Sequence, residues 1–253
     1  MPRVRLTVAY VGTRYHGWQI QERGDTIQGM LEARLGRICQ APVRVHGSGR
    51  TDAGVHAVGQ VAHFDAPESK IHIPWQKALN AMLPDDIAIV EAREADASFH
   101  ARFSATSKRY SYTLWTEPAF TLPQRAPFVW PVRGLDLIAM DQAAALVAGT
   151  HDFSSMQNAG TDVRGTIRTL EPITRAPGPH PGEWIFTFRA NGFLKQMVRN
   201  LMGLLVEAGR GTLSPGDITR ILESRDRRLA PATAPAQGLC LEEVHYEPGQ
   251  TPD

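Results

Sequence analysis

The sequence predicts an α+β protein of two lobes, each lobe a mostly antiparallel sheet with helices on one face. The chain has 253 residues, enough for one large domain or two compact lobes. Hydrophobic residues make up 42% of it and charged residues 21%, so apolar material for a core is ample. Strand-like and helix-like segments follow one another in the same order in both halves, although no sequence repeat is evident. The lobes are expected to span residues 1–104 and 105–253.

The first half opens with an alternating segment that predicts a strand near residues 3–10. A helix is expected near residues 26–38, with Asp25 or Thr26 as its N-cap. Apolar residues at helical spacing form its buried stripe: Ile27, Met30, Leu31, Leu35 and Ile38. The other elements of this half are strands near 43–46, 58–65 and 86–94, and a helix near 74–83 whose Pro74 suits a first turn.

The second half repeats this order of elements. A strand near residues 107–115 is expected to carry Tyr110, Tyr112 and Leu114 on one face. The remaining elements are a helix near 136–148, strands near 165–174 and 183–190, helices near 193–209 and 214–223, and a last strand near 239–246.

Composition excludes several classes of protein. With 27 Lys and Arg against 26 Asp and Glu, the net charge is +1, so cations must gather on one surface if the chain binds RNA. Cys39 and Cys240 would form at most one disulfide, and neither they nor the nine histidines have the spacing of a metal site. No apolar run is long enough to span a membrane, and the N-terminus is unlike a signal peptide, so a cytoplasmic location is expected.

The polar segment from His46 to Gln60 is the most informative part of the chain. It holds four glycines, two hydroxyls, the guanidinium of Arg50 and the carboxylate of Asp52, and it leads into an alternating strand. Glycine allows close backbone approach to a ligand, and a sheet beside the loop would brace it. Such a segment is also typical of a tight connection, in which Asp52 and Arg50 form a structural ion pair. It lacks the patterns of dinucleotide loops, phosphate loops and hydrolase serine turns.

Four further segments distinguish these alternatives. They are Arg5–Gln19, Ala101–Tyr112, Phe193–Asn200 and Ala234–Leu241. In this order, and together with the run Gly49-Arg50-Thr51-Asp52-Ala53-Gly54-Val55-His56, they closely resemble the TruA family of tRNA pseudouridine synthases over nearly the whole chain. The resemblance implies two ferredoxin-like or RRM-like halves around a central RNA-binding cleft.

The resemblance also implies the chemistry. Pseudouridine formation breaks the N-glycosidic bond of a uridine, turns the base and rejoins it through carbon 5, without redox change. Asp52 is expected to be the indispensable carboxylate, acting on the ribose, on the base or on a ribose proton. An aspartate is ionised at neutral pH, so it needs no histidine to activate it. No metal or other cofactor is implied.

Other residues are assigned by their match to the family segments. Arg199 is expected to pair with Asp52 and contact phosphate, and Gly203, one helical turn later, would let another backbone approach that face. Tyr110 is expected to stack on the target uracil, although it would otherwise be read as a core aromatic, and Tyr112 shares its face. Arg50 is expected to displace the target base. Leu241 is expected to line the pocket, although an aliphatic residue in a terminal strand is usually part of the core.

The expected partner is the anticodon stem-loop of tRNA, with modification at nucleotides 38, 39 and 40. The target base must leave the stack to reach the carboxylate. The following residues would line a basic cleft along the RNA backbone: Arg14, Tyr15, His16, Arg102, Lys108, Arg109, Arg164, Arg168, Lys195 and Arg199. The mixed run Arg225–Arg228 is read instead as a solvated turn. The resemblance further implies a homodimer in which one tRNA contacts both subunits.

Two other functions compete with this interpretation. A non-catalytic RNA-binding protein on the same scaffold would not need Asp52, so the intact loop disfavours it. A glycosidase or nucleoside hydrolase needs a second acid near the first, and no Asp or Glu lies beside Asp52 in the motif.

Overall fold

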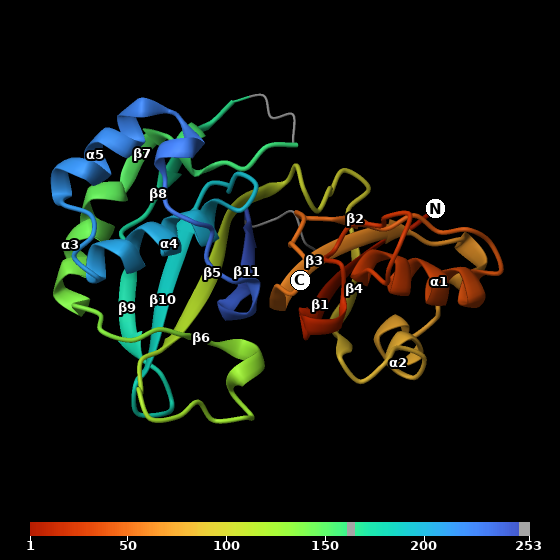
Figure 1. The fold of residues 1–253 in the computed structure, drawn as a ribbon. Coiled ribbons are helices and arrows are strands. Elements are labelled where there is room, and N and C mark those ends of the chain that lie inside the picture. The colour runs from red at the N-terminus through yellow and green to blue at the C-terminus, as the bar shows by residue number, and fades with distance from the viewer. Residues whose placement is uncertain (161–164, 248–253) are drawn as a thin grey trace. The chain divides into compact units, whose positions relative to one another are not determined.

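The structure, a computed structural model, describes residues 1–160 and 165–247 (Figure 1). It divides into two compact units, Met1–Thr106 with Cys240–Asp253, and Ser107–Leu239. Strands pair mostly antiparallel in both units, and helices account for much of the rest, so the predicted α+β class is confirmed. Within the described residues, no helix is long and apolar enough to cross a membrane.

The first unit is built on four strands in the order β4-β1-β3-β11. Strand β1 (Arg3–Tyr10) pairs antiparallel with both β3 (His56–Asp65) and β4 (Ile87–Ala95). The short β2 (His46–Gly47) also pairs with β3. Strands β1, β3 and β4 lie where the sequence predicts strands, whereas β2 shares only His46 with the strand expected near 43–46.

Strand β11 (Leu239–Tyr246) departs from the expected division of the chain. It runs parallel to β3, with Cys240 opposite His56 and Leu241 opposite Ala57. The order of elements in the sequence predicts this strand in the second lobe, residues 105–253. Parallel partners are joined by long connections, so a pattern of neighbouring residues gives no sign of the partner strand.

Two helices belong to the first unit. Helix α1 (Ile27–Cys39) begins after Thr26, whose side chain accepts a hydrogen bond from the Gly29 N–H at 3.2 Å, as the capping prediction requires. Its buried face includes Ile27, Leu31 and Leu35. Helix α2 (Trp75–Asn80) is shorter than the expected span, and Pro74 is its N-cap residue instead of its first turn.

The second unit has a sheet path β5-β10-β8-β7. Strand β10 (Glu183–Ala190) pairs antiparallel along its whole length with the last eight residues of β5 (Ala105–Trp115). The single strand expected near 165–174 is two strands, β8 (Ile167–Leu170) and β9 (Thr174–Pro177), with Pro172 between them. Proline has no N–H to donate to a ladder, which accounts for the break. The sequence does not predict β6 (Trp130–Pro131) or β7 (Gly149–Asp152), because both strands are too short to show alternation.

Three helices are grouped beside these strands (Figure 1). They are α3 (Leu137–Val147), α4 (Met197–Gly209) and α5 (Pro215–Ser224), and α3 packs against both others. Asp136 caps α3, and Ser214 and Asp217 form a capping box on α5. Helix α4 begins four residues later than predicted because Gln196 has a positive φ of 61°. Nearly every residue of α4 is buried, so it forms the centre of this unit.

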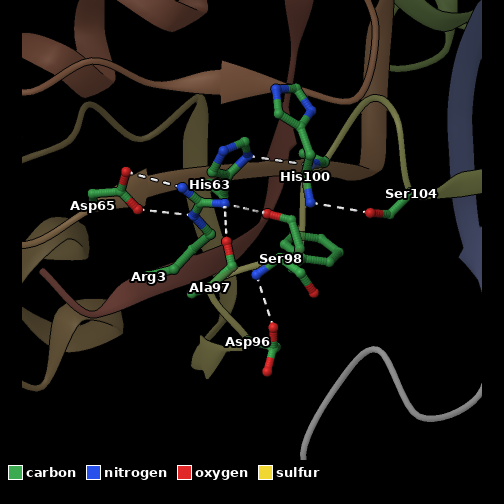
Figure 2. A network of polar contacts seen from close by, with 10 residues as sticks. Arg3, His63, Asp65, Asp96, Ala97, Ser98, His100 and Ser104 are labelled. Atoms are coloured by element: carbon green, nitrogen blue, oxygen red, sulfur yellow. Dashed lines mark hydrogen bonds and ion pairs between the residues drawn. The ribbon is translucent and has the colours of Figure 1, made fainter.

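A polar cluster fastens the segment after β4 to the sheet of the first unit (Figure 2). The guanidinium of Arg3 binds both carboxylate oxygens of Asp65, at 2.8 and 3.0 Å. The same guanidinium donates to the carbonyls of Ala97 and Phe99, both at 2.7 Å. One arginine therefore holds a neighbouring strand and the turn that leads toward β5.

His63 fixes the other end of this segment. Its Nδ1 accepts the Ala101 N–H at 3.2 Å, which leaves the other ring nitrogen to carry the proton. The ring is buried and stands 4.7 Å from that of His100 and 5.1 Å from that of His46, measured between centroids. Burial, with the charge of Arg3 and the neighbouring imidazoles, lowers the pKa of His63 to about 4.

This histidine makes stability depend on pH. The unfolded chain protonates His63 near its ordinary pKa of 6.5, whereas the folded protein does so only near 4. The contribution of neutral His63 to stability is therefore fully present above pH 6.5, and it is lost as the pH falls from 6.5 to about 4. The free energy of unfolding would be measured in urea at pH 7 and pH 4. We expect its decrease between these two pH values to be smaller by about 1–2 kcal/mol in His63→Gln than in wild type. The exposed His72→Gln is the control, and equal pH dependence in all three proteins would contradict the assignment.

Candidate active site

The loop that carries Asp52 is anchored to β3 at its start. The Ser48 N–H donates to the Val61 carbonyl at 2.7 Å, and the Ser48 hydroxyl donates to Gln60 Oε1 at 2.7 Å. The Gln60 amide in turn donates to the Gly49 carbonyl at 3.0 Å. Ser48 and Gln60 are fully buried. Polar bonds inside the core therefore fix the two residues that precede Arg50.

Residues on both sides of Asp52 are held from the N-terminal segment. Thr51 shares a hydrogen bond of 2.8 Å with the Tyr10 hydroxyl, and its carbonyl accepts the Trp18 N–H at 3.1 Å. After Asp52, the Gly54 N–H donates to the Tyr15 carbonyl at 3.3 Å. Thr51 is buried and Asp52 is half-buried. The backbone of Asp52 thus lies between two anchored neighbours while its carboxylate remains partly accessible.

Close backbone contact makes this anchoring possible. A Cβ atom on Gly17 would lie 2.5 Å from the Thr51 carbonyl oxygen, and Gly17 has a φ of +85°. A Cβ on Gly12 would lie 2.0 Å from the Val55 carbonyl oxygen. Both distances are far below any van der Waals contact, so no side chain fits at either position. The glycines of the first twenty residues are thus requirements of the loop that carries Asp52.

The other predicted residues of the first unit have distinct surroundings. Arg50 is exposed, and Arg102 is exposed beside Phe103, whose ring lies 5.8 Å from its guanidinium carbon. Arg14 donates to Asp86 at 3.0 Å. Leu241 is only 1% exposed and forms part of the sheet core.

Tyr15 shares the carboxylate of Asp86 with Arg14. Its hydroxyl donates to Asp86 Oδ1 at 2.5 Å. Burial and this bond to a carboxylate raise the pKa of Tyr15 to about 12. Its role in the structure is to anchor the segment that holds the loop, while His16 beside it is exposed.

In the second unit, Tyr110 and Tyr112 lie two residues apart on β5 and differ in their partners. Tyr110 is 8% exposed, and its ring meets Phe193 edge-to-face at a centroid distance of 5.1 Å. Tyr112 is fully buried and donates its hydroxyl to the Pro235 carbonyl at 2.7 Å. Burial raises the pKa of Tyr112. Tyr112 therefore has a structural role, which separates it from Tyr110.

Arg199 lies on α4 and contacts the segment that precedes β11. Its Nε donates to the Ala234 carbonyl at 2.7 Å, and the Ala234 N–H donates to the Arg199 carbonyl at 3.1 Å. A Cβ on Gly203 would lie 2.2 Å from the Ala232 carbonyl oxygen. The prediction that Gly203 lets a backbone approach this face of the helix is therefore confirmed.

Several predicted RNA-binding cations make internal contacts. Lys195 donates to the Ala159 carbonyl at 2.7 Å, and Arg168 donates to the carbonyls of Gly165 and Ile167 at 3.1 and 2.6 Å. On β5, Lys108 is half-buried and Arg109 is exposed. Arg164 lies outside the described residues. Among the described residues, no three His, Cys, Asp or Glu side chains are placed to hold a metal ion.

The run Arg225–Arg228 differs from its prediction as a solvated turn. Arg225 and Arg228 do form exposed ion pairs, with Asp152 at 3.2 Å and Asp226 at 2.6 Å. Arg227, however, turns inward and donates to four oxygen atoms of the protein. The sequence carries no signal for this difference, because three arginines in one turn look alike until the chain folds.

Comparisons with known proteins agree with the sequence motifs. A family model described as tRNA pseudouridine synthase matches residues 6–104 and 143–247. This chain belongs to that family. The tRNA pseudouridine synthase A of Solidesulfovibrio magneticus is 54% identical, over 97% of this chain and 92% of that protein. The tRNA pseudouridine synthase A of Nitratidesulfovibrio vulgaris strain Hildenborough is 47% identical, over 100% of this chain and 99% of that protein. The tRNA pseudouridine synthase A of Geobacillus kaustophilus is also 47% identical, over 97% of this chain and 95% of that protein.

The resemblance predicted from the sequence is thus confirmed, and this synthase is an isomerase that acts on tRNA. The residues matched by the family model include the loop around Asp52 and the whole of α4 with Arg199. Tyr110 lies between the two matched ranges. Its expected role therefore depends on the match of the segment Ala101–Tyr112 alone.

The loop anchor can be tested at Gln60. Gln60→Leu removes the acceptor of the Ser48 hydroxyl and the donor to the Gly49 carbonyl, so we expect stability to fall by about 2 kcal/mol. The rate of pseudouridine formation should fall more than about tenfold, because the loop of the synthase loses its fixed geometry. Thermal unfolding and single-turnover rates would be compared with those of Gln142→Leu, an exposed position on α3. A destabilised variant with an unchanged rate would contradict this role.

Proposed function

We propose that this synthase converts uridine to pseudouridine at nucleotides 38, 39 and 40 in the anticodon stem-loop of tRNA, with Asp52 as the catalytic carboxylate. The observation that supports Asp52 most is the construction of its loop. Thr51 and Gly54 are hydrogen-bonded to the N-terminal segment, and Ser48 and Gly49 to β3. A reacting group needs a fixed backbone and an accessible side chain, and Asp52 has both.

The proposed reaction is balanced without a cofactor. The bond between the ribose C1′ and the uracil N1 breaks, a bond from C1′ to carbon 5 forms, and the proton lost from carbon 5 is replaced by one on N1. Nothing is oxidised, reduced or hydrolysed. Because the base detaches and must turn, we propose that it leaves the RNA stack before the reaction and that exposed Arg50 takes its place.

Arg199 and Tyr110 are proposed to act on the same nucleotide. Arg199 would pair with the carboxylate of Asp52 and contact phosphate, and its hydrogen bonds to Ala234 support a fixed orientation. Tyr110 would stack on the uracil, and its edge-to-face contact with Phe193 supports a fixed ring plane. Leu241 would line the pocket.

The RNA backbone and the assembly complete the proposal. Contacts to the RNA backbone are proposed for Arg14, Arg102, Lys108, Arg109, Arg164, Arg168 and Lys195. Of these, Arg14, Arg102, Arg109 and Lys195 are exposed in the structure and are the strongest candidates. The motif resemblance supports a cytoplasmic homodimer in which one tRNA contacts both subunits.

Asp52→Asn tests the central assignment. The substitution keeps the size of the side chain and removes its charge, so we expect pseudouridine formation to fall by at least about 1,000-fold with tRNA affinity little changed. Unmodified tRNA would be treated with each protein, and pseudouridine mapped by carbodiimide-dependent stops of reverse transcription. The exposed Asp25→Asn should behave as wild type.

Each component of the proposal can fail separately. A wild-type protein that binds tRNA without forming pseudouridine would favour an RNA-binding module. Release of free uracil would favour a hydrolase. Pseudouridine outside positions 38–40 would overturn the anticodon assignment, and an active Asp52→Asn variant would overturn the role of Asp52.

A further inference from the structure

Arg227 connects three parts of the second unit through its guanidinium. Its Nε donates to Asn158 Oδ1 at 2.8 Å and its Nη1 to the Ala230 carbonyl at 3.0 Å. Its Nη2 donates to Asn200 Oδ1 and to Thr233 Oγ1, both at 3.0 Å. All three guanidinium nitrogens are therefore engaged by neutral oxygens of the protein itself.

The acceptors are joined to one another. Asn200, on α4, is fully buried and donates from its amide to the Met156 carbonyl at 2.8 Å and to Asn158 Oδ1 at 3.0 Å. The Thr233 hydroxyl donates to Asn200 Oδ1 at 2.7 Å. The other three side chains, Asn158, Arg227 and Thr233, are half-buried around it. A connected network of this kind favours one arrangement of its backbone segments, because an unmatched amide at the buried Asn200 is costly. The guanidinium is the one cation among these four side chains.

This network lies directly beside the contact between Arg199 and Ala234 in both segments. Asn200 follows Arg199 directly on α4, and Ala230 and Thr233 precede Ala234 in the opposing segment. Arg227 binds residues on both sides of this contact, and Ala234 is hydrogen-bonded to Arg199 through both its N–H and its carbonyl. A shift of the segment would therefore carry the acceptor of Arg199 Nε with it.

We propose that Arg227 is a positioning residue for Arg199. By fastening the segment Ala230–Ala234 to α4, it holds the guanidinium of Arg199 in the orientation needed for the reaction. This inference rests on the proposed role of Arg199 in catalysis. Four of its five guanidinium N–H groups donate to oxygens of the protein, so we expect Arg227 to act through Arg199 and not through a bond to RNA.

The test compares two neighbouring arginines, Arg227, which points into the protein, and Arg228, which points to solvent. Arg227→Gln can replace only part of the four hydrogen bonds, whereas the matched Arg228→Gln removes an exposed ion pair with Asp226. Thr233→Val weakens the same network with a side chain of the same shape, in case Arg227→Gln does not fold. Three properties are measured on the full chain: hydrogen exchange of the Ala234 amide, the single-turnover rate with saturating protein, and tRNA affinity as a function of salt.

For Arg227→Gln we expect faster exchange at Ala234 and a single-turnover rate lowered by about 10- to 100-fold. Thr233→Val should show the same changes to a smaller extent, and Arg228→Gln none of them. The affinity for tRNA and its salt dependence should stay as in wild type, since no phosphate contact is lost. In an Arg199→Gln background, Arg227→Gln should lower the rate no further.

Four results would overturn the inference. Unchanged rates in Arg227→Gln and Thr233→Val would show that the network does not serve the reaction. A shallower salt dependence in Arg227→Gln would show a direct phosphate contact, and additive losses in the double variant would show action independent of Arg199. If Arg199→Gln alone kept the wild-type rate, the catalytic role of Arg199 would fail and this inference with it. Hydrogen exchange at Ala234 would still report separately whether Arg227 holds the segment.

Discussion

The construction of the candidate site depends on the close approach of the N-terminal backbone to the loop that carries Asp52. Two backbone hydrogen bonds, from Trp18 to Thr51 and from Gly54 to Tyr15, hold the neighbours of the carboxylate. They form only because Gly12 and Gly17 bring the chains closer than any side chain would allow. The strands beneath the loop supply its other anchors.

Helix α4 has the corresponding role in the second unit. Nearly all residues of α4 are buried. Arg199 lies on the face of this helix where Gly203 allows the backbone of another segment to approach closely. The opposing segment is held by side chains from three directions: Arg199, Tyr112 and Arg227. Here too a glycine and a few buried polar bonds orient a charged side chain. Both units thus position polar groups through backbone contacts that are internal to the unit.

Cationic side chains fall into two groups in this chain, which has a net charge of +1 and belongs to a family that acts on tRNA. Several cations satisfy oxygens of the protein: Arg3, Arg14, Arg227, Arg168 and Lys195. These hydrogen bonds stabilise turns and segments of the protein itself. Arg50, Arg102 and Arg109 are exposed and have the character expected of contacts to a phosphate backbone.

The sequence by itself determined the family, the α+β class and most helices and strands, because motif order, alternation and capping residues such as Thr26 are local signals. It also indicated that Gly203 faces a backbone. It could not show that β11 pairs with β3, or that Arg227 turns inward while Arg228 faces solvent. Tertiary structure decided these points, because each depends on which distant segment supplies the hydrogen-bonding or packing partner.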